Sequence, residues 1–441
     1  MPSFPEAALL RPRRGLAAGG LEDRLGFFFP LFLLYPLFEY GRPENPMGIP
    51  MLMTSLVLLG WFADGNKRWH PQVWCFFALI ALMVVGTLLA VNTHSAFWHT
   101  YGMTVTLLGI CVPLMHFASS LRKISAFIQA MLAAFVYAAL YAMTHNGVGP
   151  GWQDENYVAT LMSMAFPFAY FSIFIARRMF ARVVFVMVAG LMVAAVVVSF
   201  SRGGFLGMAI VLVYCVIRSP RRWPLMVVAP VVAAAIALFA TPTYWSEMKT
   251  ISDPGEKTAE LRLDLWKIAF QMFKANPLTG VGPGNFVWNV GDYQSAEQYA
   301  HYGRSLAASA VTHSFYFELL AELGLIGTIL VGAILYRNHK DLRFVARETR
   351  REHEGAGASS IDVRRARYYE RAIAGSFIGV LVCGATVSIL YYSHLWILTA
   401  MTVSLKEAAT GLRDQHQTEG APAGPPARQW WRATQLAATE G

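Results

Sequence analysis

Long runs of apolar residues recur along the chain, and short polar stretches separate them. A helix needs about 20 apolar residues to cross the hydrocarbon core of a bilayer, and most of these runs approach that length. The pattern therefore predicts an all-α polytopic membrane protein with twelve membrane-spanning helices. We place these helices at residues 25–41, 47–63, 72–92, 97–118, 124–143, 158–176, 183–200, 204–218, 224–241, 314–336, 371–387 and 389–406.

Positive charge sets the orientation of the predicted helices. Every second gap between them is basic, and most of the 36 Lys and Arg residues fall on the side of the N-terminus. Because cytoplasmic loops retain such residues during insertion, we predict a bacterial inner-membrane protein with both termini in the cytoplasm. The net charge of +9 then reflects membrane orientation, with specific contacts to anionic lipids as the lesser alternative. It gives no reason to expect nucleic-acid binding.

Two connections are much longer than the others and divide the chain. Residues 242–312 lie on the external side, where the other loops are short, so this segment is where function should be sought. The predicted organisation is transmembrane helices one to nine in 1–241, a periplasmic loop domain in 242–312, helix ten in 313–336, a cytoplasmic linker in 337–370, helices eleven and twelve in 371–407, and a disordered cytoplasmic tail in 408–441.

A further helix is predicted inside the external segment, at residues 258–275. Apolar side chains recur there every three to four residues, and Arg262 and Trp266 lie on an adjacent stripe. This helix is either a plain amphipathic cap on the bundle or part of a site, depending on whether another residue acts together with Arg262. The glycines that follow, at 280, 282 and 284, indicate a turn rather than a phosphate-binding loop, because no strand precedes them.

Arg202 and His313 are the residues that could act together with Arg262. Arg202 stands at the predicted external start of helix eight, where an Arg at membrane depth usually faces a polar cavity. The glycines after Arg202 would let backbone N–H groups approach an anion. Two guanidiniums on one membrane face suit a pyrophosphate, which accepts bidentate hydrogen bonds.

His313 stands where the chain re-enters the membrane, and an imidazole can accept a proton from a hydroxyl near neutral pH. Each residue also has an ordinary interpretation. Arg202 could contact lipid headgroups, and His313 could be a plain interfacial residue.

Three motifs, in this order, resemble the O-antigen ligase and O-antigen polymerase-like superfamily. They are SRGG at a helix start, R-x-x-x-W followed by NPLTGVGPGNF in a long external loop, and THSFYFELLAELGLIG at the start of the next helix. The resemblance covers residues 156–336 by motif, and the whole chain by helix number and loop placement.

This resemblance implies a glycosyltransferase of the type-C membrane fold that needs no metal or other cofactor. The expected donor is an O-antigen glycan on undecaprenyl pyrophosphate, and the expected acceptor is lipid A-core oligosaccharide, at the periplasmic face of the bilayer. Arg202 and Arg262 would hold the pyrophosphate, and His313 would deprotonate the attacking sugar hydroxyl. The anomeric configuration would invert in one displacement.

The resemblance also implies contacts to the substrates beyond these three residues. Trp266 and Phe286 would line the path of the donor. Asn156, together with its neighbours Asp154 and Glu155 in the preceding short external loop, would shape the site.

Other functions share part of this pattern. An O-antigen polymerase uses the same pyrophosphate chemistry with a second lipid-linked repeat unit as acceptor. A protein O-oligosaccharyltransferase usually continues into a further extracytoplasmic region after its last helices, and only a short basic and Pro-rich tail stands here, which favours the ligase. A transporter of an anionic solute or lipid is the alternative from another class. It is disfavoured because the two halves of the sequence do not resemble each other and the predicted helices contain few acidic residues.

Overall fold

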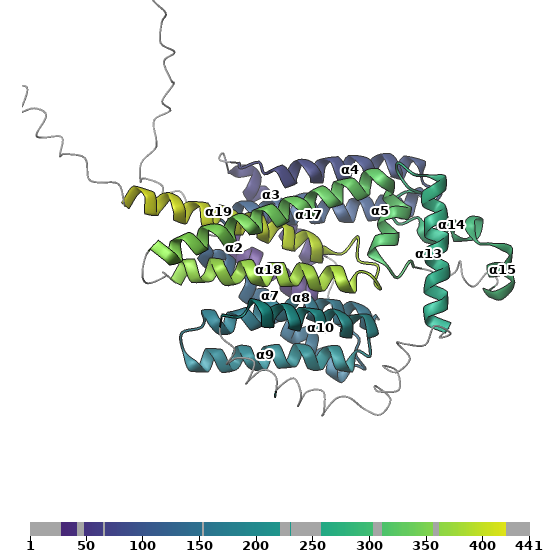
Figure 1. Ribbon diagram of the computed structural model, residues 1–441. Coiled ribbons are helices and arrows are strands. Elements are labelled where there is room, and N and C mark those ends of the chain that lie inside the picture. Colours follow the sequence, from purple (N-terminus) through teal and green to yellow (C-terminus); the bar gives the residue numbers. More distant parts are fainter. Residues whose placement is uncertain are drawn as a thin grey trace, which may run out of the picture.

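The protein is a bundle of helices with one helix lying across its end (Figure 1). The computed structural model describes residues 28–41, 48–64, 67–151, 154–220, 230, 257–302, 311–355 and 361–419. Within these ranges the secondary structure is helical, without a β-strand. The prediction of an all-α membrane-type fold is thereby confirmed.

The helices keep the order of the predicted spans. They are α2 (Phe28–Gly41), α3 (Gly48–Ala63), α4 (Pro71–Leu89), α5 (Thr93–Thr104), the π-helix η1 (Val105–Cys111), α6 (Val112–Phe117), α7 (Leu121–Thr144), α8 (Glu155–Ile175), α9 (Met179–Val198), α10 (Arg202–Arg218), α13 (Lys257–Ala275), α14 (Phe286–Tyr293), α15 (Ala296–Tyr302), α17 (Phe315–Gly355), α18 (Ile361–Cys383) and α19 (Ser393–Glu419).

In the described part of the chain, helices occupy the predicted spans except the ninth, 224–241, which lies outside it apart from residue 230. Six helical stretches of that part are long and apolar enough to cross a membrane. The number twelve therefore stays a prediction.

Two predicted boundaries differ from the structure. Helix α17 continues beyond residue 336 to Gly355, and α18 already begins at Ile361, so the described residues of the predicted linker are helical. The Arg, Glu, Lys and Ala residues of this stretch are good helix formers, and a helix that leaves the apolar layer does not need to end there. Helix α19 likewise extends to Glu419, into the predicted disordered tail.

Helix α8 lies at the centre of the bundle and is buried along almost its whole length. Helix α18 packs closely against it because glycines face the contact. A Cβ on Gly379 would come within 2.8 Å of the Ser163 carbonyl oxygen. Nearby, the Ser376 hydroxyl donates a hydrogen bond to the Met164 carbonyl at 2.6 Å. Small residues at helix contacts are how membrane bundles gain close packing.

Helix α13 lies across one end of the bundle, which we call the α13 end (Figure 1). Its apolar stripe forms a small separate core with α14 and the first turns of α17, made by Leu265, Ile268, Ala269, Met272, Val281, Phe286, Val290 and Ala321. The predicted helix at 258–275 and its apolar stripe are confirmed.

The connection from α13 to α14 forms backbone hydrogen bonds with α17 where that helix is interrupted. Gly324 has φ +61°, so the helix is interrupted there and its backbone groups turn outward. The loop pairs with them: Val281 N–H donates to the Ala321 carbonyl at 2.9 Å, and Leu325 N–H donates to the Pro277 carbonyl at 2.8 Å. The loop replaces hydrogen bonds that the interrupted helix has lost. It thereby fixes α13 relative to the bundle.

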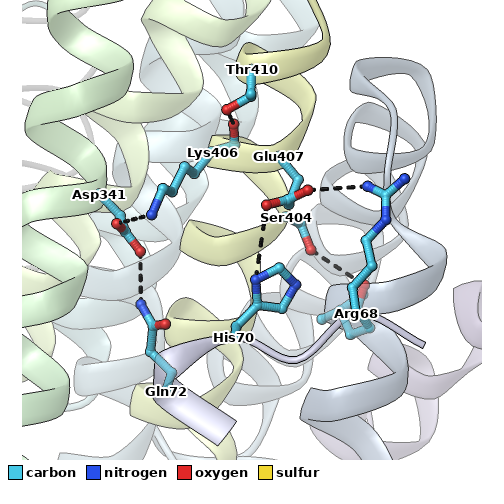
Figure 2. A network of polar contacts seen from close by, with 9 residues as sticks. Arg68, His70, Gln72, Asp341, Ser404, Lys406, Glu407 and Thr410 are labelled. Carbon is cyan, nitrogen blue, oxygen red and sulfur yellow. Dashed lines mark hydrogen bonds and ion pairs between the residues drawn. The ribbon is translucent and has the colours of Figure 1, made fainter. Parts of the chain in front are cut away.

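The opposite end of the bundle is held by ion pairs and a hydrogen bond that join α17, α19, the start of α4 and the residues just before α4 (Figure 2). Asp341 of α17 accepts hydrogen bonds from Gln72 at 2.7 Å and from Lys406 at 2.6 Å. Glu407, the next residue of α19, pairs with Arg68 at 3.0 Å. Asp341 and Glu407 therefore each meet a cation from a different part of the chain.

Candidate functional site

His313 lies at the α13 end, in the tight turn that leads into α17. Its backbone has φ +46°, a left-handed conformation that costs free energy for a residue with a side chain. The neighbours hold this turn in place. Trp266 Nε1 of α13 donates to the Thr312 carbonyl at 3.0 Å, and the Phe315 N–H donates to the Gly384 carbonyl at 2.7 Å. The His313 side chain is thus presented from a turn that is fixed on both sides.

Arg262 and Asp154 surround the half-buried His313 imidazole with opposite charges. Burial lowers the pKa of His313 below its ordinary value of 6.5, the positive charge of Arg262 lowers it further, and the negative charge of Asp154 acts in the other direction. The net result is an imidazole that is neutral at pH 7. A neutral imidazole beside a guanidinium can accept a proton while an anion is bound next to it.

The starts of α8 and α10 meet at the same end of the bundle. Asp154 caps α8 by accepting hydrogen bonds from the backbone N–H of Asn156 at 2.8 Å and from its side-chain amide at 3.0 Å. The Asn156 amide oxygen in turn accepts from the Ser201 hydroxyl at 2.7 Å. Ser201 caps α10 by accepting from the Gly204 N–H at 3.0 Å. One chain of hydrogen bonds therefore connects Asp154, whose charge acts on His313, to the residue before Arg202.

Arg202 is the first residue of α10 and is half-buried at this junction. The structure thus places Arg202, Arg262 and His313 at one end of the bundle, as the sequence predicts. The charge of Arg262 acts on His313 directly. Joint binding of one anion by the two arginines stays a prediction.

The paired glycines after Arg202 have a packing role that the sequence analysis did not assign, and the anion contact predicted for them stays a prediction. A Cβ on Gly203 would overlap the Thr386 hydroxyl, and a Cβ on Gly204 would overlap the Ala159 methyl group. The Gly204 N–H is already bound to Ser201. These glycines allow α10 to pack against α8 and against the turn after α18.

The two predicted aromatic residues lie in different surroundings. Trp266 is half-buried, stacks on Phe317 with ring centroids 5.1 Å apart, and holds the turn of His313. Phe286 is only 3% exposed and packs in the small core under α13. The substrate contact predicted for Phe286 stays untested, and its burial leaves little surface for one. Asn156 is the predicted site residue that organises the helix starts.

Glu322 has a structural role that the sequence analysis did not assign. This buried side chain of α17 accepts hydrogen bonds from the Gly284 N–H at 2.7 Å and from the Phe286 N–H at 2.9 Å, and Tyr391 donates its hydroxyl to the same carboxylate. Another carboxylate one turn earlier, Glu318, accepts from the Leu390 N–H at 3.1 Å. The sequence signal that could have indicated this role is the pair of glutamates four residues apart in an otherwise apolar helix.

His99 of α5 was also missed and completes the packing around the glycine turn. Its ring lies 4.8 Å from that of Tyr391, and a Cβ on Gly284 would overlap it. Gly284 has φ +61°, so both the space and the backbone conformation require glycine there. The glycine turn therefore packs against α5, α17 and the segment before α19.

Residues 187–332 match the family model described as O-antigen ligase. The matched segment is about a third of the chain and extends from α9 to the first part of α17, so it includes Arg202, Arg262 and His313. No curated protein matches the chain. The resemblance seen in the motifs is confirmed over these residues, where the chain is similar to O-antigen ligases.

Proposed function

We propose that this protein is an O-antigen ligase of the bacterial inner membrane. It transfers O-antigen polysaccharide from undecaprenyl pyrophosphate to lipid A-core oligosaccharide at the periplasmic face, and both termini lie in the cytoplasm. The observation that carries the proposal is the half-buried His313, whose pKa is lowered by burial and by Arg262, in a segment that matches the ligase family.

The proposed reaction is a single displacement at the anomeric carbon of the donor. A hydroxyl of the acceptor sugar forms the new glycosidic bond, and its proton passes to the neutral imidazole of His313. The bond between the anomeric carbon and the pyrophosphate oxygen breaks, so the configuration inverts. Undecaprenyl pyrophosphate leaves with the additional negative charge, which the guanidiniums of Arg262 and Arg202 stabilise.

Neighbouring residues hold these groups in position. Trp266 fixes the turn that carries His313, and Asp154 and Asn156 tie the start of α8 to the start of α10. Positioning of this kind lowers the entropy cost of bringing donor, acceptor and base together. We propose that catalysis needs no metal ion, since the two cations already stabilise the leaving group.

The test is transfer by the purified protein in detergent or vesicles. Undecaprenyl-pyrophosphate glycan and rough lipopolysaccharide are supplied with a metal chelator and without nucleotide, and ladder formation is followed on a gel. We expect transfer by the unchanged protein and a loss of about 10²- to 10⁴-fold in His313→Ala, the usual contribution of a positioned base. His301→Ala is the matched control, because His301 is an exposed histidine on α15 of the same external segment, and it should retain the full rate.

The assay also separates the alternatives. Longer lipid-linked chains without modified lipopolysaccharide would identify a polymerase, and transfer to a supplied acceptor protein would identify an O-oligosaccharyltransferase. A protein that changes neither substrate but moves an anionic lipid between leaflets would be a transporter. Full transfer by His313→Ala would contradict the role of the base.

A further inference from the structure

A large cavity opens at the end of the bundle opposite to the candidate site. It has a volume of about 980 Å³ and lies between the C-terminal end of α10, the second half of α17 and residues 367–381 of α18. Residue Arg218 of its wall ends α10, whose first residue is Arg202. At 1.5 Å per residue the two ends of this helix are about 24 Å apart. The cavity is therefore separate from the site around His313.

One half of the cavity wall is strongly basic. It carries Arg218, Arg343, Arg347, Arg350, Arg367 and Arg371. Glu370 is the one carboxylate among the described residues of the wall, and it pairs with Arg218 at 3.5 Å. The excess of guanidiniums raises the local potential, which favours a ligand with negative charge.

The other half of the wall is apolar. Going from Arg371 along α18, the wall residues at helical spacing are Ala374, Phe377, Ile378 and Leu381, and Leu335 faces them from α17. These residues belong to the apolar layer of the bundle, whereas the arginines lie beyond it. A ligand that fills the cavity must therefore have a charged end and an apolar end.

We propose that this cavity binds an anionic membrane lipid. The arginines hold its phosphate, and the acyl chains lie along the apolar wall formed by α17 and α18. A free phosphate compound would use only the charged half and leave the apolar half in contact with water. The site is independent of the proposed glycosyl transfer, because its arginines lie at the opposite end of the bundle and its wall contains none of Arg202, Arg262 and His313.

The first experiment measures lipid binding to the delipidated full-length protein by native mass spectrometry. The probes are phosphatidylglycerol, phosphatidylcholine with the same chains, glycerophosphoglycerol and inorganic phosphate. The cavity variant is Arg343→Gln with Arg347→Gln. The control variant is Arg178→Gln with Lys340→Gln, which removes the same charge from exposed positions outside the cavity wall.

We expect the unchanged protein to bind one phosphatidylglycerol more tightly than the other three probes. The cavity variant should lose about tenfold or more of this affinity, because each Arg near the membrane surface contributes about 1 kcal/mol to attraction of an anionic lipid. The control variant should keep it. Equal loss in both variants, no loss in either, or binding of inorganic phosphate or glycerophosphoglycerol as tight as that of the lipid would overturn the proposal.

A second variant tests the apolar half without any change of charge. Ala374→Trp fills the space between α18 and α17 with a large side chain, so it should abolish the tight phosphatidylglycerol site while all the arginines remain. Unchanged lipid affinity in Ala374→Trp would also overturn the proposal. The Ala374→Trp measurement tests the proposal by itself if the double Arg variant fails to fold.

Discussion

The two ends of the bundle use their carboxylates in different ways. At the α13 end, the buried Glu322 and the half-buried Glu318 accept backbone N–H groups of loop segments. At the opposite end, Asp341 and Glu407 accept from the side chains of Lys406 and Arg68. A carboxylate that accepts hydrogen bonds from backbone N–H groups fixes the path of a loop. A carboxylate that pairs with the flexible side chain of a Lys or Arg mainly neutralises its positive charge. The difference teaches that the backbone is fixed most precisely at the end of the bundle where the reaction is proposed.

The largest effect should come from Glu322→Ala. The substitution leaves the Gly284 and Phe286 N–H groups without their acceptor, and each buried unsatisfied donor costs about 1–3 kcal/mol. The loop would move with α13, which carries Arg262, so transfer should fall more than 100-fold, in the range seen when a transition-state contact is lost. Thermal unfolding and the ladder assay measure the two effects.

The comparison for this variant is Asp341→Ala at the opposite end. It should also destabilise the protein, because Lys406 and Gln72 lose a buried partner. Folded Asp341→Ala should nevertheless transfer glycan at nearly the normal rate. Similar losses of transfer in the two folded variants would show that the ends do not differ in the way described.

Arg262→Gln should have the next largest effect, on both rate and pH dependence. Loss of a cation that stabilises the leaving group lowers the rate by about 10²- to 10³-fold. Because Arg262 lowers the pKa of His313, its removal raises that pKa. The activity on the acid side should then disappear at a higher pH than in the unchanged protein, as a pH–rate profile would show.

Asp154→Asn gives the shift of opposite sign in the same measurement. Asp154 raises the pKa of His313, so its removal should let activity persist to lower pH. Asn is also a good helix cap, so the start of α8 should be preserved. A profile that moves in the same direction in both variants would rule out electrostatic control of His313 by this pair.

Gly203→Ala should cost about 1–3 kcal/mol of stability, the usual cost of overpacking, because its methyl group overlaps the Thr386 hydroxyl. Gly332→Ala is the matched control, since a Cβ on this helical glycine meets nothing within 4 Å. Thr386→Ala should restore most of the lost stability in the double variant. Failure of this rescue would mean that Gly203 serves something other than packing, and melting temperatures of the four proteins decide the matter.

Arg68→Gln should have the smallest effect. The Arg68 side chain is 60% exposed in its pair with Glu407, and exposed ion pairs contribute about 0–1 kcal/mol. Neither the melting temperature nor the transfer rate should change appreciably. A large loss of transfer would show that the two ends are functionally coupled, against the difference described between them.

The sequence predicts the helices well because apolar runs and helical spacing are local signals. The starts and ends are less accurate at α17 and α18, where charged residues that form good helices continue beyond the apolar layer. The arrangement of His313 and Arg262 follows from the predicted sidedness of the chain. Their interaction through space is visible only in the structure.

The pairing of the glycine turn with α17 was not predictable from periodicity. Backbone hydrogen bonds such as Gly282 N–H to the Glu322 carbonyl join segments forty residues apart and leave no repeat in the sequence. Gly203 and Gly204, in contrast, give a clear local signal in the sequence, but this signal has two interpretations. Paired glycines suit both anion binding and close packing, and their packing role becomes visible only with the positions of Thr386 and Ala159.

The break at Gly324 has a consequence for how the protein is assembled in the membrane. The loop after α13 needs the carbonyl groups of Ala321 and Glu322, and these residues follow it in the chain. During synthesis the loop is therefore made before its binding partners, and it can adopt its final path only when both residues are present. A fragment that ends before residue 315 lacks both carbonyl groups, so added protease should cut its loop readily, and this sensitivity should be absent from the full-length protein.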